Sequence, residues 1–400
     1  MQFTLLKSRL KMQENLKDID LEGFLKYKTL YYDKIDFSIV KNSWECLKSH
    51  IDLPYVIHIV GTNGKGSTGR FLAHYLYKKD FNVVHYSSPH ITNFNERVWL
   101  NGNNVSDELL ENTHKKIQNI LNLQLLEKLT YFEYTTLLAL FISSKCDYII
   151  LEAGLGGEFD ATNVVTNNLS LITTIDLDHQ AFLGNSVEEI ARTKMRACDK
   201  QMIVGYQIHE SVKKSALKVK EEINNEFNKQ ISIAFVEDFN KYSFSVDFPR
   251  YLINNLHLVI SCLEFLNIDI DLKLFDDVKL KGRCEKIASN ITIDVGHNPL
   301  AARALKEHFK DKKITLIYNS YKDKDYKEVL KVLKPIIDEV IILEIDDKRI
   351  VDKLNLLEIC KSYNIMASFN LELKKDKEYL VFGSFLVVEK FLGFLGVDEK

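Results

Sequence analysis

Short, continuous runs of apolar residues alternate with stretches of helical periodicity along most of the chain. Runs without polar alternation are typical of strands that are buried on both faces of a sheet. We expect strands at 55–60, 82–86, 147–151, 169–175, 202–204, 291–295, 314–318, 340–345 and 379–382. Apolar residues at helical spacing predict helices over 5–27, 71–76, 106–122, 133–143, 299–310, 323–334 and 384–395.

This alternation predicts an α/β protein with parallel, doubly wound sheets. We expect two domains: an N-terminal domain of the P-loop type over residues 1–283, and a smaller, Rossmann-like C-terminal α/β domain over residues 284–400. The polar stretch 281–290 marks the change, since a second series of strands and helices begins there. The length of 400 residues agrees with about two to three domains of ordinary size.

Composition and charge exclude several classes of protein. Lys and Arg number 53 and Asp and Glu 56, so the chain lacks the basic excess of a general nucleic-acid binder. No run approaches the ~20 apolar residues that span a bilayer, and residues 1–17 lack the apolar core of a signal peptide. We therefore expect a cytoplasmic protein without nucleic-acid or membrane partners. The six cysteines are scattered and form no CxxC, which argues against a disulfide framework or a zinc site.

The segment 61–67, Gly-Thr-Asn-Gly-Lys-Gly-Ser, joins a predicted strand to a predicted helix. Glycines allow backbone N–H groups to turn toward an anion, and the helix N-terminus adds partial positive charge. Lys65 can reach the β- and γ-phosphates of a nucleotide, and Ser67 can assist the phosphates or a metal ion. The spacing is shorter than the usual GxxxxGK[ST] pattern. An ordinary glycine-rich turn between strand and helix remains the alternative.

Polar side chains also follow other predicted strands. Glu152 comes directly after the run 147–151, at the carboxyl end where open α/β sheets bind ligands. It is a candidate metal ligand, and the alternative is a solvent-facing carboxylate. His179 follows the run 169–175 and is a second candidate metal ligand, although Mg²⁺ prefers oxygen ligands. Ser88 stands before a proline, where a serine is common in ordinary turns.

Further sequence blocks occur in an order typical of one family. They lie at 58–68, 86–90, 95–98, 129–134, 151–163, 178–194, 282–283 and 294–299, with a weaker block at 383–385. Together they resemble the folylpolyglutamate synthase/dihydrofolate synthase family of the Mur ligase superfamily, in its bacterial bifunctional form. The blocks 129–134 and 151–163 are not expected in a Mur ligase that makes peptidoglycan precursors.

The resemblance implies an ATP-dependent ligase that joins L-glutamate to dihydropteroate and to folates. A carboxylate is a poor electrophile toward amines, so ATP would first convert it to an acyl phosphate. The implied partners are small molecules, with ATP as co-substrate and two Mg²⁺ ions as cofactor, and the implied state is a monomer. One alternative is another Mur-superfamily amide ligase that acts on a non-folate carboxylate. Another is a nucleotide-dependent switch protein that hydrolyses ATP without ligation.

The resemblance also implies roles for individual residues, position by position. The implied catalytic residues are Lys65, Lys194 and His297. The implied metal ligands are Ser88, Glu152 and His179. The implied ATP-binding residues are Thr62, Asn63, Gly64, Lys65, Gly66, Ser67, Asn255, Arg283 and Asp294. The implied pterin-binding residues are Thr130, Tyr131, Phe132, Glu133, Phe159, Asp160 and Ala161.

Lys194 stands where the family carries a carbamylated lysine that supports a second metal ion. The sequence departs from the family directly after it, because Met-Arg-Ala at 195–197 replaces residues that are usually small. Because of this departure, the sequence does not determine how Lys194 packs. The alternative is that Lys194 is an exposed lysine on a helix. Tyr131 and Phe132 could be core residues at a helix start, and His297 could be a turn residue.

Overall fold

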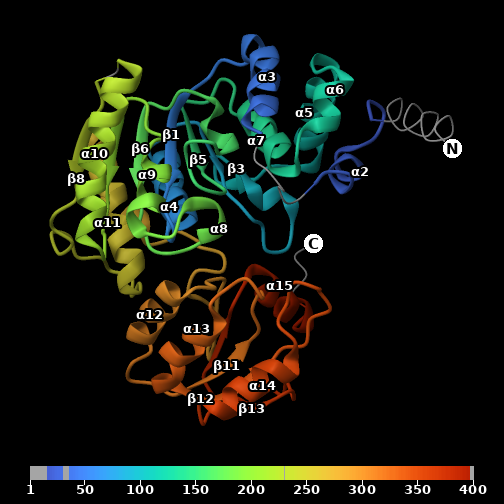
Figure 1. Cartoon of the computed structure of the whole chain (residues 1–400), viewed down its shortest axis with the longest axis vertical. Coiled ribbons are helices and arrows are strands. Elements are labelled where there is room, and N and C mark those ends of the chain that lie inside the picture. The colour runs from blue at the N-terminus through green and yellow to red at the C-terminus, as the bar shows by residue number, and fades with distance from the viewer. Residues whose placement is uncertain (1–15, 30–35, 229, 397–400) are drawn as a thin grey trace. The chain divides into compact units, whose positions relative to one another are not determined.

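The computed structural model describes residues 16–396, apart from 30–35 and 229. Its internal contacts divide the chain into two compact units. The first unit comprises the described residues up to Ser88 together with Asn95–Asp238 and His257–Phe275. The second comprises Pro89–Phe94, Phe239–Leu256 and the described residues from Asp276 onward. Each unit has its own sheet covered by helices (Figure 1). The predicted two-domain α/β fold is confirmed, whereas a boundary after residue 283 stays a prediction.

The first unit contains an eight-stranded sheet in the order β4-β3-β2-β5-β1-β6-β7-β8. The strands are β1 (Tyr55–Val60), β2 (Val83–Tyr86), β3 (Val98–Leu100), β4 (Asn103–Asn104), β5 (Tyr148–Glu152), β6 (Leu169–Ile172), β7 (Gln201–Val204) and β8 (Ser232–Phe235). All neighbours run parallel except at the β4-β3-β2 edge. Parallel strands end at the same edge, so the residues after β2, β5, β1 and β6 lie along it.

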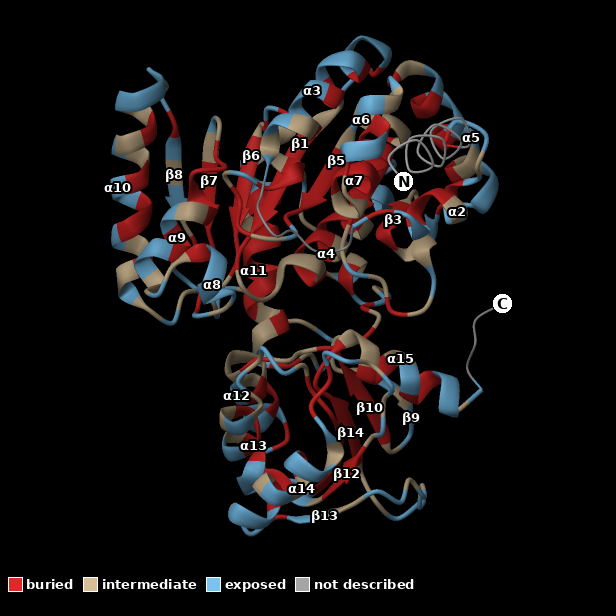
Figure 2. Cartoon of the chain, turned by 45° about the vertical axis from the view of Figure 1, so that its right-hand side comes forward, coloured by how far each residue is buried: buried red, intermediate tan, exposed pale blue. Residues whose placement is uncertain are grey.

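Helices cover this sheet (Figure 1). They are α2 (Leu21–Lys26), α3 (Phe37–Leu47), α4 (Lys65–Lys78), α5 (Asp107–Ile120), α6 (Leu123–Lys128), α7 (Tyr131–Ile142), α8 (Gln180–Leu183), α9 (Val187–Met195) and α10 (Glu210–Phe227). Helix α11 (Arg250–Phe265) contributes its first residues to the second unit and the rest to the first. Figure 2 shows the central strands buried and the outer side of α10 exposed.

The second unit contains a six-stranded sheet in the order β13-β12-β11-β14-β10-β9. Its strands are β9 (Glu285–Ala288), β10 (Ile291–Asp294), β11 (Ile314–Tyr318), β12 (Ile337–Ile342), β13 (Met366–Ser368) and β14 (Tyr379–Phe382). Only β9 runs antiparallel to its neighbour among these strands. The covering helices are α12 (Pro299–His308), α13 (Tyr326–Leu333), α14 (Lys353–Ser362) and α15 (Phe385–Phe394). No helix in the described part of the chain is long and apolar enough to cross a membrane.

Two predicted elements need correction. The helix predicted over 5–27 is wrong for residues 16–20, which form turns, and residues 1–15 lie outside the described residues. The helix starts only at Leu21, because the Asp20 side chain accepts the Gly23 N–H and caps it. The strand predicted over 340–345 begins three residues earlier, at Ile337, since its polar second and third residues hide its start.

Candidate active site

The glycine loop after β1 is tied to the neighbouring strand and leads straight into α4. The N–H groups of Thr62 and Asn63 both donate to the Thr174 carbonyl, over 2.9 and 3.2 Å. Gly64 adopts a left-handed conformation with φ 91° directly before α4. The Lys65 ammonium donates to the carbonyls of Gly61 and Thr62 over 3.1 and 3.3 Å. Cationic charge and the N-terminus of a helix thus meet at one loop, as phosphate binding requires.

Gly64→Ala is expected to weaken this loop, because left-handed backbone costs an L-residue about 1–2 kcal/mol. The KM for ATP should rise and the melting temperature should fall. The matched control is Gly393→Ala inside α15, where an added Cβ meets nothing within 4 Å. That control should be neutral or stabilising, since alanine favours a helix by up to about 1 kcal/mol. A variant Gly64→Ala with unchanged melting and unchanged KM would contradict the assignment.

Thr62 connects the glycine loop to the segment that follows β6. Its hydroxyl donates to the Asp176 carbonyl over 2.9 Å and accepts the Asp176 N–H over 3.1 Å. The Asp176 carboxylate lies 3.1 Å from His209 Nε2, at the start of α10. The hydroxyl of Thr62 therefore organises the loop. Sequence reasoning missed His209, which has no motif and lies 33 residues beyond its partner.

Ser88 and Glu152 meet at the ends of neighbouring strands. Glu152 is the last residue of β5 and is buried, with 5% exposure. Its Oε2 accepts the Ser88 N–H over 3.2 Å. The structure thus brings together a hydroxyl-bearing residue and a carboxylate, which supply the oxygen donors that Mg²⁺ prefers. The alternative of a solvent-facing Glu152 is wrong.

His179 lies on a different turn, in the left-handed conformation with φ 51° at the start of α8. Its Nε2 is 3.9 Å from Asp178 Oδ1. Within the described ranges, no group of three or more His, Cys, Asp and Glu side chains could hold a metal ion. The metal role of His179 therefore stays a prediction.

Lys194 lies on the last turn of α9 and is buried, with 5% exposure. The alternative of an exposed helix lysine is wrong. Burial lowers the pKa of its ammonium to about 7; the positive charge of Lys65 lowers it further, whereas Asp178 and Asp160 raise it. A lysine so placed loses its proton at a much lower pH than an exposed lysine, and its neutral amine can react as a nucleophile.

The predicted pterin block 130–133 forms the start of α7. Thr130 and Glu133 build a reciprocal capping box, in which Glu133 Oε2 accepts the Thr130 N–H over 2.9 Å. Burial raises the pKa of the Glu133 carboxyl. The Phe132 ring packs so closely on Gly154 that a Cβ there would lie 2.6 Å away. The guanidinium of Arg97 stands 5.0 Å from the centre of the Tyr131 ring.

The second predicted pterin segment combines an exposed aromatic ring with a buried carboxylate. Phe159 is 57% exposed, and its ring lies edge-on to Phe37 at 6.5 Å. Asp160 is buried and accepts the Leu155 N–H over 2.7 Å and the Thr162 hydroxyl over 2.6 Å. Burial raises the pKa of the Asp160 carboxyl. Phe159 is free to stack on a ligand, while Asp160 holds its own loop together. Ala161, which follows, is buried.

Four predicted residues belong to the second unit. Asp294 is buried at the end of β10 and accepts the Tyr251 hydroxyl and the Cys284 N–H, each over 2.9 Å. The Arg283 guanidinium lies 5.2 Å from the Phe385 ring. His297 Nδ1 is 3.3 Å from the Val295 carbonyl. The fourth, Asn255, is buried on α11.

Family comparisons agree with this architecture. The Mur ligase middle domain matches residues 59–274, and the Mur ligase glutamate ligase domain matches residues 282–385. These two matches and the phosphate-binding type of loop define the class of protein as a Mur ligase, an ATP-dependent ligase. The chain belongs, within that class, to the dihydrofolate synthase/folylpolyglutamate synthase family.

The similarity extends over nearly the whole chain. The dihydrofolate synthase/folylpolyglutamate synthase of Haemophilus influenzae is 31% identical over 417 residues, covering 90% of this chain and 94% of the relative. The crystal structure of Helicobacter pylori folylpolyglutamate synthetase matches with 38% identity and a TM-score of 0.75, over 94% and 98% of the two chains. Escherichia coli FolC in complex with DHPP and ADP matches with 25% identity and a TM-score of 0.79, over 95% and 99%.

Proposed function

We propose that the protein uses ATP and Mg²⁺ to join L-glutamate to dihydropteroate, and to extend folates with further glutamate. The observation that carries this proposal is the joint placement of the glycine loop, with Lys65 over its carbonyls, and the Ser88–Glu152 pair. Both lie at the carboxyl edge of one sheet, where β2, β5 and β1 are neighbours. The FolC structure contains ADP, which supports nucleotide binding by this chain.

The reaction needs an activated carboxylate. A carboxylate oxygen of the pterin substrate attacks the γ-phosphorus of ATP, and ADP leaves. The glutamate amine then attacks the acyl carbon, and inorganic phosphate leaves from the tetrahedral intermediate as the amine loses a proton. The Lys65 ammonium and the loop N–H groups stabilise the negative charge that develops on the transferred phosphoryl group. Phe159 and Phe132 would orient the flat pterin ring by stacking.

Ser88 and Glu152 are the residues that fit a magnesium ion, with His179 as the proposed third ligand. The oxygen donors of Ser88 and Glu152 and the neighbouring strands that carry them support this pair, and His179 is included on the resemblance alone. When bound, Mg²⁺ would neutralise charge on the phosphate oxygens. Asp294 and Arg283 are proposed to help bind ATP, and His297 to lie near the reacting groups. The predicted monomeric state and cytoplasmic location stay predictions.

Lys194 is proposed to carry a carbamate, formed when its neutral amine attacks CO₂ and releases a proton. Because its pKa is about 7, the reactive amine is abundant at pH 8 and lost as the pH falls below 7. Removing CO₂ at pH 8 should lower kcat, and added bicarbonate should restore it. Lys194→Met should have a low kcat that added bicarbonate does not change. The control Lys218→Met, which removes an exposed lysine, should respond to CO₂ and bicarbonate as the wild type does. Equal wild-type rates with and without CO₂ would refute the carbamate.

The proposed function is tested by phosphate release from MgATP in the presence of glutamate. Dihydropteroate, a tetrahydrofolate and a peptidoglycan precursor are compared as the carboxylate, and products are identified by mass. Stimulation by the first two substrates, with one glutamate added to each, is expected. If neither pterin raises phosphate release above the rate with ATP alone, the substrate assignment is wrong. Stimulation by the third substrate alone would favour another Mur-superfamily ligase.

A further inference from the structure

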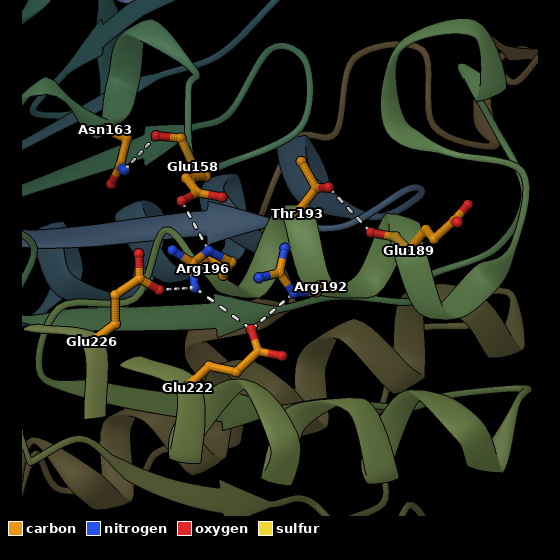
Figure 3. A network of polar contacts seen from close by, with 8 residues as sticks. All are labelled: Glu158, Asn163, Glu189, Arg192, Thr193, Arg196, Glu222 and Glu226. Carbon is orange, nitrogen blue, oxygen red and sulfur yellow. Dashed lines mark hydrogen bonds and ion pairs between the residues drawn. The ribbon is translucent and has the colours of Figure 1, made fainter. Parts of the chain in front are cut away.

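The loop between β5 and the short 3-10 helix Ala161–Val164 is held by three contacts of Glu158, of which Figure 3 shows those with Asn163 and Arg196. The Glu158 N–H donates to the Thr193 carbonyl over 3.0 Å. The Glu158 carbonyl accepts from Asn163 Nδ2 over 3.0 Å. Its carboxylate Oε1 accepts from Arg196 Nε over 2.8 Å. Glu158 directly precedes Phe159, so these contacts determine where the exposed ring stands.

Arg196 joins this loop to α10. Its side chain is only 5% exposed, although arginine is among the residues least often buried. Besides Glu158, its Nη1 lies 2.9 Å from Glu226 Oε2 and 3.5 Å from Glu222 Oε2. The carboxylates of Glu226 and Glu158 beside it raise the pKa of its guanidinium above the ordinary value. The rigid, permanently charged fork of arginine suits such a junction better than the flexible ammonium of lysine.

The loop also approaches the helix that carries Lys194. A Cβ on Gly157 would lie 2.4 Å from the Lys194 carbonyl oxygen, so loop backbone and helix backbone are in close contact. Arg196 is the C-cap residue of the same helix. The segment that follows Lys194 therefore supplies a buried arginine that pairs with the loop.

We propose that Arg196 is a positioning residue, which acts through Glu158 to hold Phe159 in place for the pterin substrate. This inference rests on the proposed function. The inference predicts different effects on the two substrates. Pterin binding depends on Arg196, whereas ATP binding does not, because the glycine loop contains none of the carboxylates that pair with Arg196.

Two matched variants test this inference. Glu158→Ala and Glu226→Ala each remove one carboxylate from Arg196, but only the first removes the side-chain contact between Arg196 and the loop. Steady-state KM values for pterin and for ATP are measured, together with hydrogen exchange of the amides of residues 154–161. Glu158→Ala and Arg196→Lys should raise the pterin KM roughly tenfold, because a charged hydrogen bond is lost. The ATP KM should change by less than about twofold, and the loop amides should exchange faster.

The control variant Glu226→Ala should leave both KM values and the loop exchange unchanged. Glu158→Gln, which retains an acceptor oxygen, should have a pterin KM close to that of the wild type. Faster exchange without a change in pterin KM would overturn the inference and leave the network a stability element. Unchanged exchange in Arg196→Lys and Glu158→Ala would overturn it as well. A wild type without pterin-dependent turnover would overturn the proposed function and this substrate role, while the exchange data would still decide whether Arg196 fixes the loop.

Discussion

Lys65→Ala is expected to abolish ATP-dependent ligation, with kcat falling roughly a thousandfold or more. The ammonium of Lys65 is held over the loop by the carbonyls of Gly61 and Thr62. Its charge is therefore already in place when the γ-phosphoryl group arrives, and no solvent reorganisation is needed. Steady-state kinetics with dihydropteroate, glutamate and MgATP measure the loss.

The control for this variant is Lys78→Ala, which removes an exposed lysine at the other end of the same helix. It should retain wild-type turnover. Unfolding curves of both variants should lie close to that of the wild type, since Lys65 is only half-buried and Lys78 is exposed. If Lys65→Ala keeps near-normal turnover, the glycine loop has no part in the chemistry.

Glu152→Ala should lower kcat by roughly two to three orders of magnitude and raise the Mg²⁺ concentration needed for half-maximal activity. The buried carboxylate stands at the strand edge beside Ser88, and alanine offers no oxygen in its place. The measurement is turnover as a function of Mg²⁺ concentration. Glu108→Ala, which removes an exposed carboxylate from α5, is the control. A near-normal rate and an unchanged Mg²⁺ requirement in Glu152→Ala would remove this residue from the metal site.

The central strands and the glycine loop could be predicted because their signals are local, whereas β3, β4, β8, β9 and β13 were not predicted. A mostly apolar run such as 55–60, followed by glycines and helical spacing, requires no knowledge of distant residues. The block 130–133 was harder to interpret. A Thr-x-x-Glu pattern is typical of a capping box, and the structure uses Thr130 and Glu133 in that way. Thr130 and Glu133 can therefore both cap the helix and contact the substrate, and the sequence pattern does not separate these two roles.

The polar network around the site could not be predicted, because its partners are distant in sequence. Arg196 bonds to Glu158, 38 residues earlier, and to Glu226 on the following helix. His209 pairs with Asp176 in the same way, across two different elements. Neither pair forms a motif, and the packing of α9 and α10 brings Arg196 to Glu222 and Glu226.

The most direct test of the ligase mechanism follows an oxygen atom. Dihydropteroate labelled with ¹⁸O in its carboxylate is incubated with the protein, MgATP and glutamate, and both products are analysed by mass spectrometry. The mechanism predicts dihydrofolate and, in equal amount, inorganic phosphate that contains a single ¹⁸O from the substrate. Unlabelled phosphate would contradict the acyl-phosphate route. Phosphate release without any glutamate adduct would contradict the assignment as a ligase of this substrate.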